Sequence, residues 1–124
     1  MDIDAATFSQ EWAQAWNNHD IDAVLAHFHD DAAFTSPVAA QLYPDTAGVI
    51  RGKAALRQYW SGALQRIPNL HFVVEDVYRG IDTLVINYRN QNGGLVNEVL
   101  RFGSDGLVIE GHGTYLVSRS AATA

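Results

Sequence analysis

The sequence lacks cysteine, and this absence excludes several kinds of site. Without a thiol there is no disulfide framework, no cysteine nucleophile, no thiolate zinc site and no iron–sulfur cluster. The sequence also lacks an apolar run of the roughly 18 residues that a membrane-spanning helix needs. The N-terminal Met-Asp-Ile-Asp is acidic, where a secretion signal is basic and then apolar. We therefore expect a cytoplasmic protein with no membrane partner.

Positive charge is scarce and unevenly distributed along the chain. Residues 1–50 contain eight Asp or Glu and no Lys or Arg, whereas residues 51–124 contain all eight basic residues and six acidic ones. The formal net charge is −6. Because a nucleic-acid surface needs clustered cations, no nucleic-acid partner is expected. The glycine patterns of phosphate loops and Rossmann folds are also missing, so no nucleotide, nicotinamide or flavin cofactor is expected.

Length and composition indicate one folded domain. The chain has 124 residues, of which 48% are hydrophobic and 18% charged, as is typical of a globular protein. This length corresponds to a single domain, and we find no repeat or linker within 1–124. We expect residues from about 118 to 124 to form a flexible tail.

The predicted elements place helices first and the sheet last. Apolar residues at helical spacing predict helices over residues 4–17, 21–28 and 53–67. A short strand is expected at 32–36, a loop at 37–50, and four strands at 70–78, 82–90, 95–102 and 107–117. The short turns between these four strands force them to run antiparallel. The order α-α-β-α-β-β-β-β therefore predicts an α+β fold with an antiparallel meander.

Six short motifs occur in order along most of the chain. They are Trp16-Asn17-Asn18-His19-Asp20, Phe28-His29-Asp30-Asp31-Ala32, Ser36-Pro37, Ile50-Arg51-Gly52-Lys53, Glu98-Val99-Leu100-Arg101-Phe102 and Asp105-Gly106. Through their order and spacing, the chain resembles the nuclear transport factor 2-like superfamily, in its SnoaL-like and ketosteroid-isomerase-like branch.

This resemblance implies a cone, in which a strongly curved antiparallel sheet wraps around three helices and leaves a pocket at the wide end. It also implies a homodimer through the outer face of the sheet. The residues expected on that face are Val99 and Arg101, together with Leu84, Ile86 or Tyr88. The family contains isomerases, polyketide cyclases and dehydratases as well as binding proteins, so the fold does not define the function.

Ketosteroid isomerases use a tyrosine on the first helix, an aspartate base before the proline that ends the first strand, and a protonated aspartate on the fourth strand. The matching positions in this chain are Trp12, Ser36 and Glu98. Serine without a paired base cannot abstract a proton near neutral pH. The sequence therefore argues against steroid isomerisation by that mechanism, and Glu98 is the main catalytic candidate.

Glu98 is the acid with the most informative surroundings. Strand alternation groups it with apolar residues on one face of the strand at 95–102, where a carboxylate must be paired, protonated or in a pocket. Pairing through an Asn-Gly turn would place Asn87 opposite Glu98, and pairing through a Gly-Gly turn would place Arg89 there. Arg89, a second catalytic candidate, would then neutralise Glu98 or bind an anionic substrate group. An ordinary cross-strand ion pair is the alternative.

His112 is the third catalytic candidate, because histidine is the usual acid or base near neutral pH. Alternation puts it on the opposite strand face from Tyr115. The resemblance favours Tyr115 inward, which turns His112 toward the dimer face, but a pocket role for His112 stays open. His27 and His29 do not have the i, i+4 spacing that converges two imidazoles on one ion, so no metal site is expected.

The other candidates are expected to line a pocket for a ligand. They are Trp12, Trp16, Phe34, Ser36, Trp60, Asn87 and Tyr115. Helical spacing alone would explain Trp12 and Trp16 as core, yet some rings must face the cavity of a hollow cone. The sequence thus predicts binding of a small, mostly apolar organic molecule, with cofactor-free acid/base chemistry of isomerase, cyclase or hydratase type. The alternative is a non-catalytic ligand-binding or dimerisation module.

Overall fold

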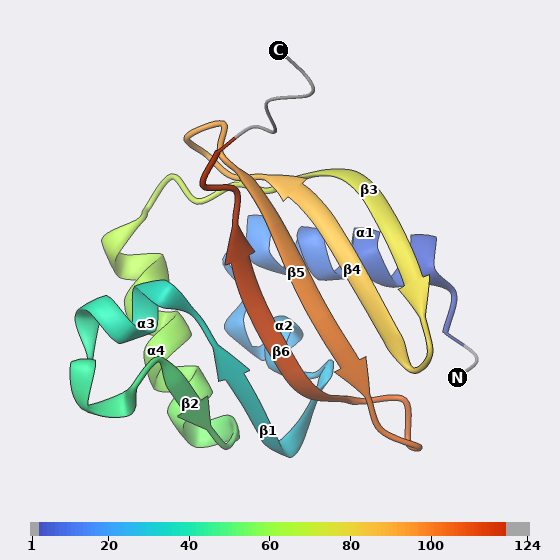
Figure 1. Ribbon diagram of the computed structural model, residues 1–124, viewed down its shortest axis with the longest axis horizontal. Coiled ribbons are helices and arrows are strands. Elements are labelled where there is room, and N and C mark those ends of the chain that lie inside the picture. The colour runs from blue at the N-terminus through green and yellow to red at the C-terminus, as the bar shows by residue number, and fades with distance from the viewer. Residues whose placement is uncertain (1–2, 119–124) are drawn as a thin grey trace.

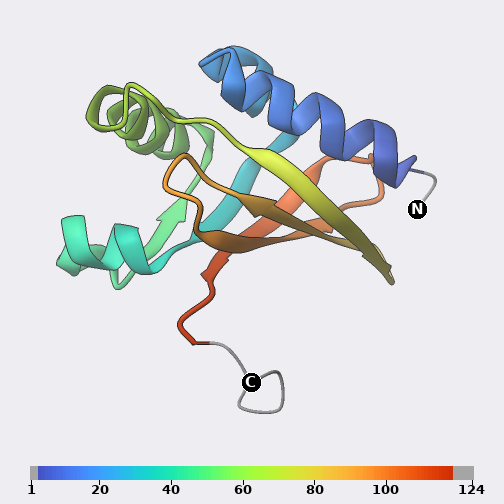
Figure 2. The same cartoon turned by 90° about the horizontal axis from the view of Figure 1, so that it is seen from above.

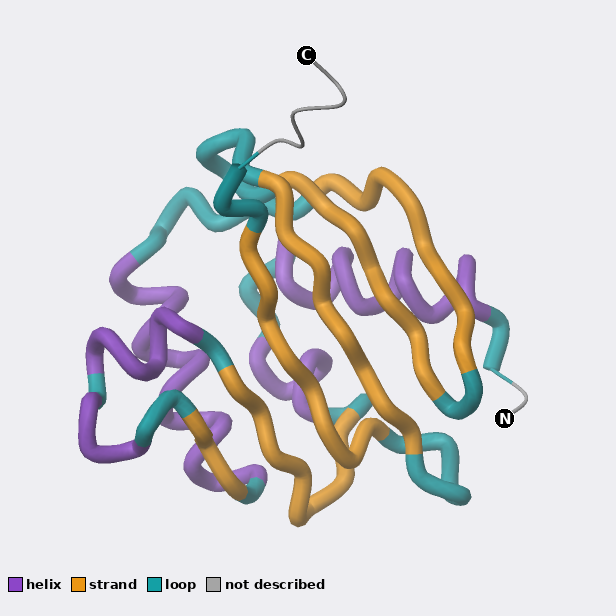
Figure 3. Tube along the Cα trace, in the orientation of Figure 1, coloured by secondary structure: helices purple, strands orange, loops and turns teal. Residues whose placement is uncertain are grey.

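A computed structural model describes residues 3–118 (Figures 1 and 3). Helices and strands are interspersed along the chain as far as Arg66, and only strands follow. The helices are α1 (Ala5–Asn17), α2 (Ile21–Leu25), α3 (Pro37–Leu42), the 3-10 helix η1 (Pro44–Thr46) and α4 (Lys53–Arg66). The strands are β1 (Phe28–Thr35), β2 (Val49–Arg51), β3 (Val73–Gly80), β4 (Thr83–Arg89), β5 (Leu95–Phe102) and β6 (Val108–Tyr115). The expected flexible tail lies outside the described residues, apart from residue 118 itself.

The six strands form one curved sheet in the order β2-β1-β6-β5-β4-β3 (Figure 1). Strands β3 to β6 are the predicted antiparallel meander. Strand β1 pairs with β6 in parallel and with β2 in antiparallel orientation, so the sheet is mixed. Parallel pairing needs a long connection, and here the whole meander separates β1 from β6. The predicted cone-shaped α+β fold is confirmed.

The segment predicted as the loop 37–50 is more regular than expected. It contains α3, η1 and β2. The Ser36 side chain accepts a hydrogen bond from the Val38 backbone N–H at 3.1 Å, and Pro37 occupies the first turn. Serine before a helix and proline at its first position are a recognised helix start. Pro37 therefore begins a helix as well as ending β1.

The helices cover one face of the sheet and leave the other without a helix. Seen from above, α1 (blue) and α4 (green) lie on the same side of the strands (Figure 2). Aspartates cap the first two helices: Asp4 accepts a hydrogen bond from the Thr7 backbone N–H at the start of α1, and Asp20 accepts one from the Ala23 N–H at the start of α2. Gly52, at φ 87°, precedes α4. The buried core lies between these helices and the sheet. Among its fully buried members are Trp12, Phe28, Leu56, Leu84, Ile86 and Leu100.

The hairpin between β4 and β5 has a register that differs from both sequence-based alternatives. The observed partners are Ile86 with Glu98 and Arg89 with Leu95. Asn90 closes a five-residue loop, because its side-chain oxygen accepts from the backbone N–H groups of Asn92 and Gly94, both at 3.0 Å. The prediction that Asn87 or Arg89 lies opposite Glu98 was therefore wrong.

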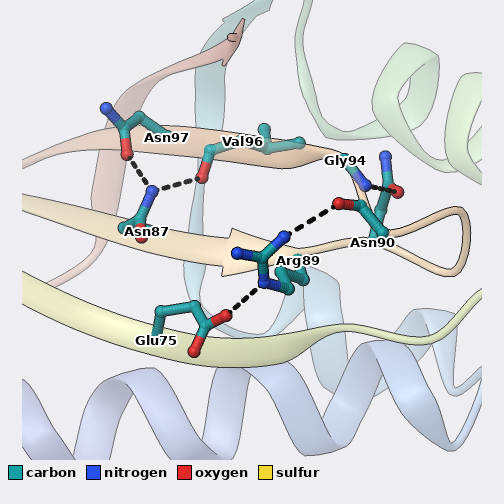
Figure 4. Close-up of polar contacts among 8 residues, drawn as sticks. Glu75, Asn87, Arg89, Asn90, Gly94, Val96 and Asn97 are labelled. Carbon is teal, nitrogen blue, oxygen red and sulfur yellow. Dashed lines mark hydrogen bonds and ion pairs between the residues drawn. The ribbon is translucent and has the colours of Figure 1, made fainter. Parts of the chain in front are cut away.

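Asn87 and Arg89 instead lie on the outer face of the sheet. Asn87 donates to Asn97 Oδ1 at 2.8 Å, and Arg89 pairs with Glu75 on β3 (Figure 4). Three residues that were expected on the outer face lie on the inner face instead. They are Leu84, Ile86 and Tyr88, which are buried beneath the helices. Paired residues of an antiparallel ladder lie on the same face of the sheet. The observed register differs by one residue from the Asn-Gly alternative, so the β4 residues expected on the inner face and those expected on the outer face change places.

Asn17 ties the end of α1 to the segment that enters β3. Its side-chain oxygen accepts from the Phe72 N–H at 2.7 Å, and its amide donates to the Phe72 carbonyl at 2.9 Å. Nearby, His19 Nε2 lies 3.0 Å from the Leu70 carbonyl oxygen. Because this segment forms no strand of its own before Val73, Asn17 supplies the pairing that a neighbouring strand would supply.

Replacing Asn17 by Ala should lower the free energy of unfolding by about 2 kcal/mol, because two backbone groups of Phe72 lose partners worth roughly 1 kcal/mol each. Asn18→Ala is the matched control, since Asn18 is exposed and its side chain makes no hydrogen bond within residues 3–118. Urea denaturation followed by tryptophan fluorescence measures both. Equal midpoints for the two variants would contradict the role assigned to Asn17.

Candidate ligand pocket

A cavity of about 150 Å³ lies between α1, α4 and the inner face of the sheet. Its wall is mostly aromatic and comes from elements far apart in the sequence. The rings that line it include Trp12, Trp16, Phe34, Trp60, Phe72 and Tyr88. Trp60 contacts Trp16, Phe28 and Phe34 at centroid distances of 5.5, 5.0 and 5.3 Å. Edge-to-face packing of this kind makes the wall stiff as well as apolar.

Glu98 is the acid in the wall of this cavity. It lies on β5 and is 7% exposed. Burial raises its pKa from the usual 4.5 to about 7, because the charged carboxylate loses its hydration, and the hydrogen bond from Tyr88 only partly opposes this. The Tyr88 hydroxyl donates to Glu98 Oε1 at 3.4 Å. Near neutral pH this carboxyl group therefore exists in both protonation states.

Hydroxyl groups surround the carboxyl group of Glu98. Ser36, Tyr59 and Tyr115 line the same cavity as Tyr88. Burial raises the pKa of Tyr59 and of Tyr115, and the Ser36 hydroxyl, which interacts with both phenols, opposes that rise. The negative charge of Glu98 also raises the pKa of these tyrosines. The tyrosines are therefore neutral near pH 7 and can donate hydrogen bonds beside the carboxyl group.

Two glycines on β6 make room for the Phe34 ring and for the carboxyl group. A Cβ on Gly111 would lie 3.3 Å from Phe34 Cδ1, so the ring packs directly on the strand. Gly113 is the cross-strand partner of Glu98. A Cβ on Gly113 would lie 3.8 Å from Glu98 Oε1 and 3.9 Å from Ser36 Oγ. The missing side chain at Gly113 therefore lets the Glu98 carboxyl group and the Ser36 hydroxyl group lie close to the backbone of β6.

The structure brings together most of the ligand-binding candidates from the sequence. The cavity is lined by Trp12, Trp16, Phe34, Ser36, Trp60 and Tyr115, and by Glu98. Asn87 is not among the lining residues, and neither are the catalytic candidates Arg89 and His112. These three lie on the outer face of the sheet. The pocket position expected for Asn87 was wrong, whereas Arg89 forms the ordinary cross-strand ion pair that was its alternative and His112 points outward, as the resemblance favoured.

His112 takes part in a polar chain across the outer face. Its Nδ1 lies 2.6 Å from Thr35 Oγ1, and its Nε2 lies 2.8 Å from Glu110 Oε1. Glu110 also accepts from Arg101 at 3.2 Å, and these two contacts lower the pKa of Glu110. Thr35 is next to His112 because β1 and β6 pair in parallel.

Sequence reasoning missed several lining residues. Tyr88 was assigned to the outer face, although strand alternation with Leu84 and Ile86, both fully apolar, could have grouped it with the core. Arg66, Asn90 and Gln91 line the cavity from the end of α4 and from the β4–β5 hairpin. No sequence pattern joins these two segments, because they meet only in the tertiary structure.

Within residues 3–118, no group of three or more His, Asp or Glu side chains is arranged to hold a metal ion. No helix in that part of the chain is both long enough and apolar enough to cross a membrane.

The chain combines a cone-shaped α+β fold with an aromatic cavity on the inner face of its sheet. Comparison with known protein families identifies the class to which such a chain belongs. Residues 9–117 match the SnoaL-like domain family. The chain belongs to this SnoaL-like family.

Solved structures agree with this assignment. A SnoaL-like protein of unknown function from Burkholderia thailandensis is 40% identical, with a TM-score of 0.87 over 90% of this chain and 93% of the other. A nuclear transport factor 2-like protein of unknown function from Cytophaga hutchinsonii is 13% identical, with a TM-score of 0.70 over 94% and 93%. TerC, co-crystallised with polyporic acid, is 12% identical, with a TM-score of 0.74 over 91% and 92%. The latter two likenesses show the fold alone. No curated protein matches the chain.

The raised pKa of Glu98 predicts that stability falls as pH rises. The unfolded carboxyl group loses its proton near pH 4.5, whereas the folded one keeps it until about pH 7. The free energy of unfolding should therefore fall by about 3 kcal/mol between pH 4.5 and 7 and then level off. Urea denaturation at several pH values measures this.

Glu98→Gln should remove this part of the pH dependence, because glutamine does not titrate. Glu11→Gln, on the exposed side of α1, should leave it in place. A wild-type curve that runs parallel to the Glu98→Gln curve from pH 4.5 to 8 would show that the folded carboxyl group titrates as an exposed one does.

Proposed function

We propose that this protein binds a small, mostly apolar organic molecule in the aromatic cavity, with a carbonyl or hydroxyl group of that molecule at Glu98. The observation that carries this proposal is a buried carboxyl group in the wall of a cavity made largely of aromatic rings. Ligand sites commonly combine an apolar wall with a few polar groups that fix orientation. TerC, which shares the fold, was crystallised with a small molecule, and this supports the same use of the fold here.

The volume of the cavity suits a ligand with one ring. At about 150 Å³ it is well below the roughly 300–1,000 Å³ typical of sites for drug-sized ligands. A dry apolar cavity of about 150 Å³ holds a benzene molecule in another protein. A single aromatic or alicyclic ring therefore fits between Trp60, Phe34 and Glu98, whereas a four-ring steroid does not.

Acid/base chemistry at this site would run through Glu98. When protonated, it donates a hydrogen bond to a carbonyl oxygen, and when ionised it accepts a proton from carbon or oxygen. A pKa of about 7 makes both forms accessible. Ser36 and the tyrosines would then hold the oxygen atom of the ligand, and no cofactor is required. A ligand-binding module without catalysis would use the same groups for recognition only.

Gly113→Ala should weaken binding of phenol and acetophenone by about fivefold, because its methyl group takes up space beside Glu98 at a cost of roughly 1 kcal/mol. The new Cβ would be 3.5 Å from Phe34 Cζ, an ordinary contact, so the protein should fold normally. Tryptophan fluorescence titration measures the affinity. Gly80→Ala at the end of β3 is the matched control and should bind as the wild type does.

Glu98→Gln distinguishes binding from chemistry in the same assay. It keeps the shape and the hydrogen bonding of the side chain but cannot transfer a proton, so binding should persist. Wild-type protein that binds none of a broad set of one-ring compounds, by fluorescence or by melting temperature, would overturn the proposed function.

We further propose that the outer face of the sheet joins two copies of the chain. No helix covers this face in the described part of the chain (Figure 2). A row of cross-strand partners runs over it from Tyr78 through Val85 and Val99 to His112. Tyr78 is 60% exposed. A row of this kind, apolar from Tyr78 to Val99, favours association when it lies on an open face.

Light scattering on the wild type should give twice the chain mass of 13.6 kDa at micromolar concentration. Val99→Glu should give the single-chain mass, because it places a carboxylate in the middle of the proposed contact, where its burial is costly. Ile81→Glu, at the exposed tip of the β3–β4 turn, should stay dimeric. A wild type that scatters as one chain would contradict the dimer.

A further inference from the structure

We infer that the ligand is a one-ring carboxylate, and that Arg66 and the side-chain amide of Asn90 bind its carboxylate at the mouth of the cavity. This inference rests on the proposed function, which places the opposite, neutral polar group of the same molecule at Glu98.

Arg66 is the cation of the cavity wall and has no partner in the part of the chain that the structure describes. It is the last residue of α4, is exposed, and lines the cavity. Burial raises the pKa of Tyr59, another residue of the cavity wall, and the positive charge of Arg66 opposes that rise. Within residues 3–118 it makes no hydrogen bond or ion pair. By contrast, Arg57 on the same helix pairs with Asp22 at 2.7 Å.

Asn90 supplies unused donors from the opposite side of the mouth. Its oxygen already accepts from two backbone N–H groups of the β4–β5 loop. That use fixes which end of the amide is the oxygen, and it leaves the Nδ2 group with no partner among the described residues. Asn90 and Arg66 both line the cavity, so the unused donors of the two residues belong to the wall of the same space.

A carboxylate matches this pair of donors. It offers two acceptor oxygens, and hydrogen bonds from arginine to a carboxylate are among the strongest that proteins make. The guanidinium cannot lose its proton, so the attraction persists at all physiological pH values. The chain as a whole is acidic, with a net charge of −6, so an unpaired arginine at an otherwise apolar opening gives this site its local preference for an anion.

Glu98 and Arg66 therefore select different groups of the ligand. Glu98 is buried and favours a neutral hydroxyl or carbonyl, because a second anion beside it would be repelled. Arg66 is exposed and favours an anion. A ring with a hydroxyl group at one end and a carboxylate at the other meets both requirements.

The test compares 4-hydroxybenzoate with 4-hydroxybenzamide, which has the same shape without the charge. Titration by tryptophan fluorescence at pH 6 and low salt should give the wild type a preference for the carboxylate of roughly tenfold, the lower end expected for a hydrogen-bonded charge. The preference should shrink in 0.5 M NaCl, because exposed charges are screened.

Arg66→Gln should abolish this preference and leave the affinity for 4-hydroxybenzamide within twofold of the wild type. Asn90→Asp keeps the oxygen that closes the loop but removes the donors, so it should weaken 4-hydroxybenzoate selectively. Arg57→Gln, on the same helix but paired away from the cavity, is the control and should keep the full preference.

The possible failures are distinguishable. Equal binding of the two compounds by the wild type, or an equal loss of both in Arg66→Gln, would overturn the carboxylate assignment and leave the proposed function standing. Binding of neither compound by the wild type would overturn the carboxylate assignment, and the proposed function would fall with it only if the wild type bound none of the other one-ring compounds, phenol and acetophenone included.

Discussion

The rings that α1 and α4 press against the inner face of the sheet set the shape of both the core and the cavity. Trp60 packs edge-on against Trp16, Phe28 and Phe34, while Trp12 stacks on Phe72 at 5.5 Å. Rigid rings cannot adapt to fill every space between a curved sheet and straight helices, so they leave a hollow where the strands diverge from α4. The cavity is thus a consequence of how the core packs.

Glu98 gains its properties from this packing. The same rings that stabilise the core exclude water from its carboxyl group, and this desolvation raises its pKa to about 7. Tyr88 supplies one hydrogen bond, and Gly113 on the neighbouring strand places no side chain against the carboxyl group. A charge that is costly to bury is tolerated here because the carboxyl group can keep its proton. Burying the carboxyl group lowers the stability of the fold, but it provides the titratable group that a site for recognition or proton transfer requires.

Much of the fold and part of the site could be predicted from local patterns. Helical spacing located α1 and α4 to within a residue or two, and strand alternation placed Glu98 on the inner face of β5 with Leu100. The tryptophans and Tyr115 were assigned to the cavity wall through the family resemblance. Ser36-Pro37 was read as the end of a strand, although a capping serine followed by proline also begins a helix, and α3 does start there.

The sequence by itself determined which residues of each strand share a face, because side chains alternate along any extended chain. It could not determine which strands are neighbours or in what register they pair. The five-residue loop that Asn90 closes moved Asn87 and Arg89 away from Glu98, and the parallel contact of β1 with β6 put Thr35 beside His112. Arg66 and Asn90 meet at one opening only after α4 and the β4–β5 hairpin have packed. Such contacts depend on non-local geometry, which single-residue preferences do not encode.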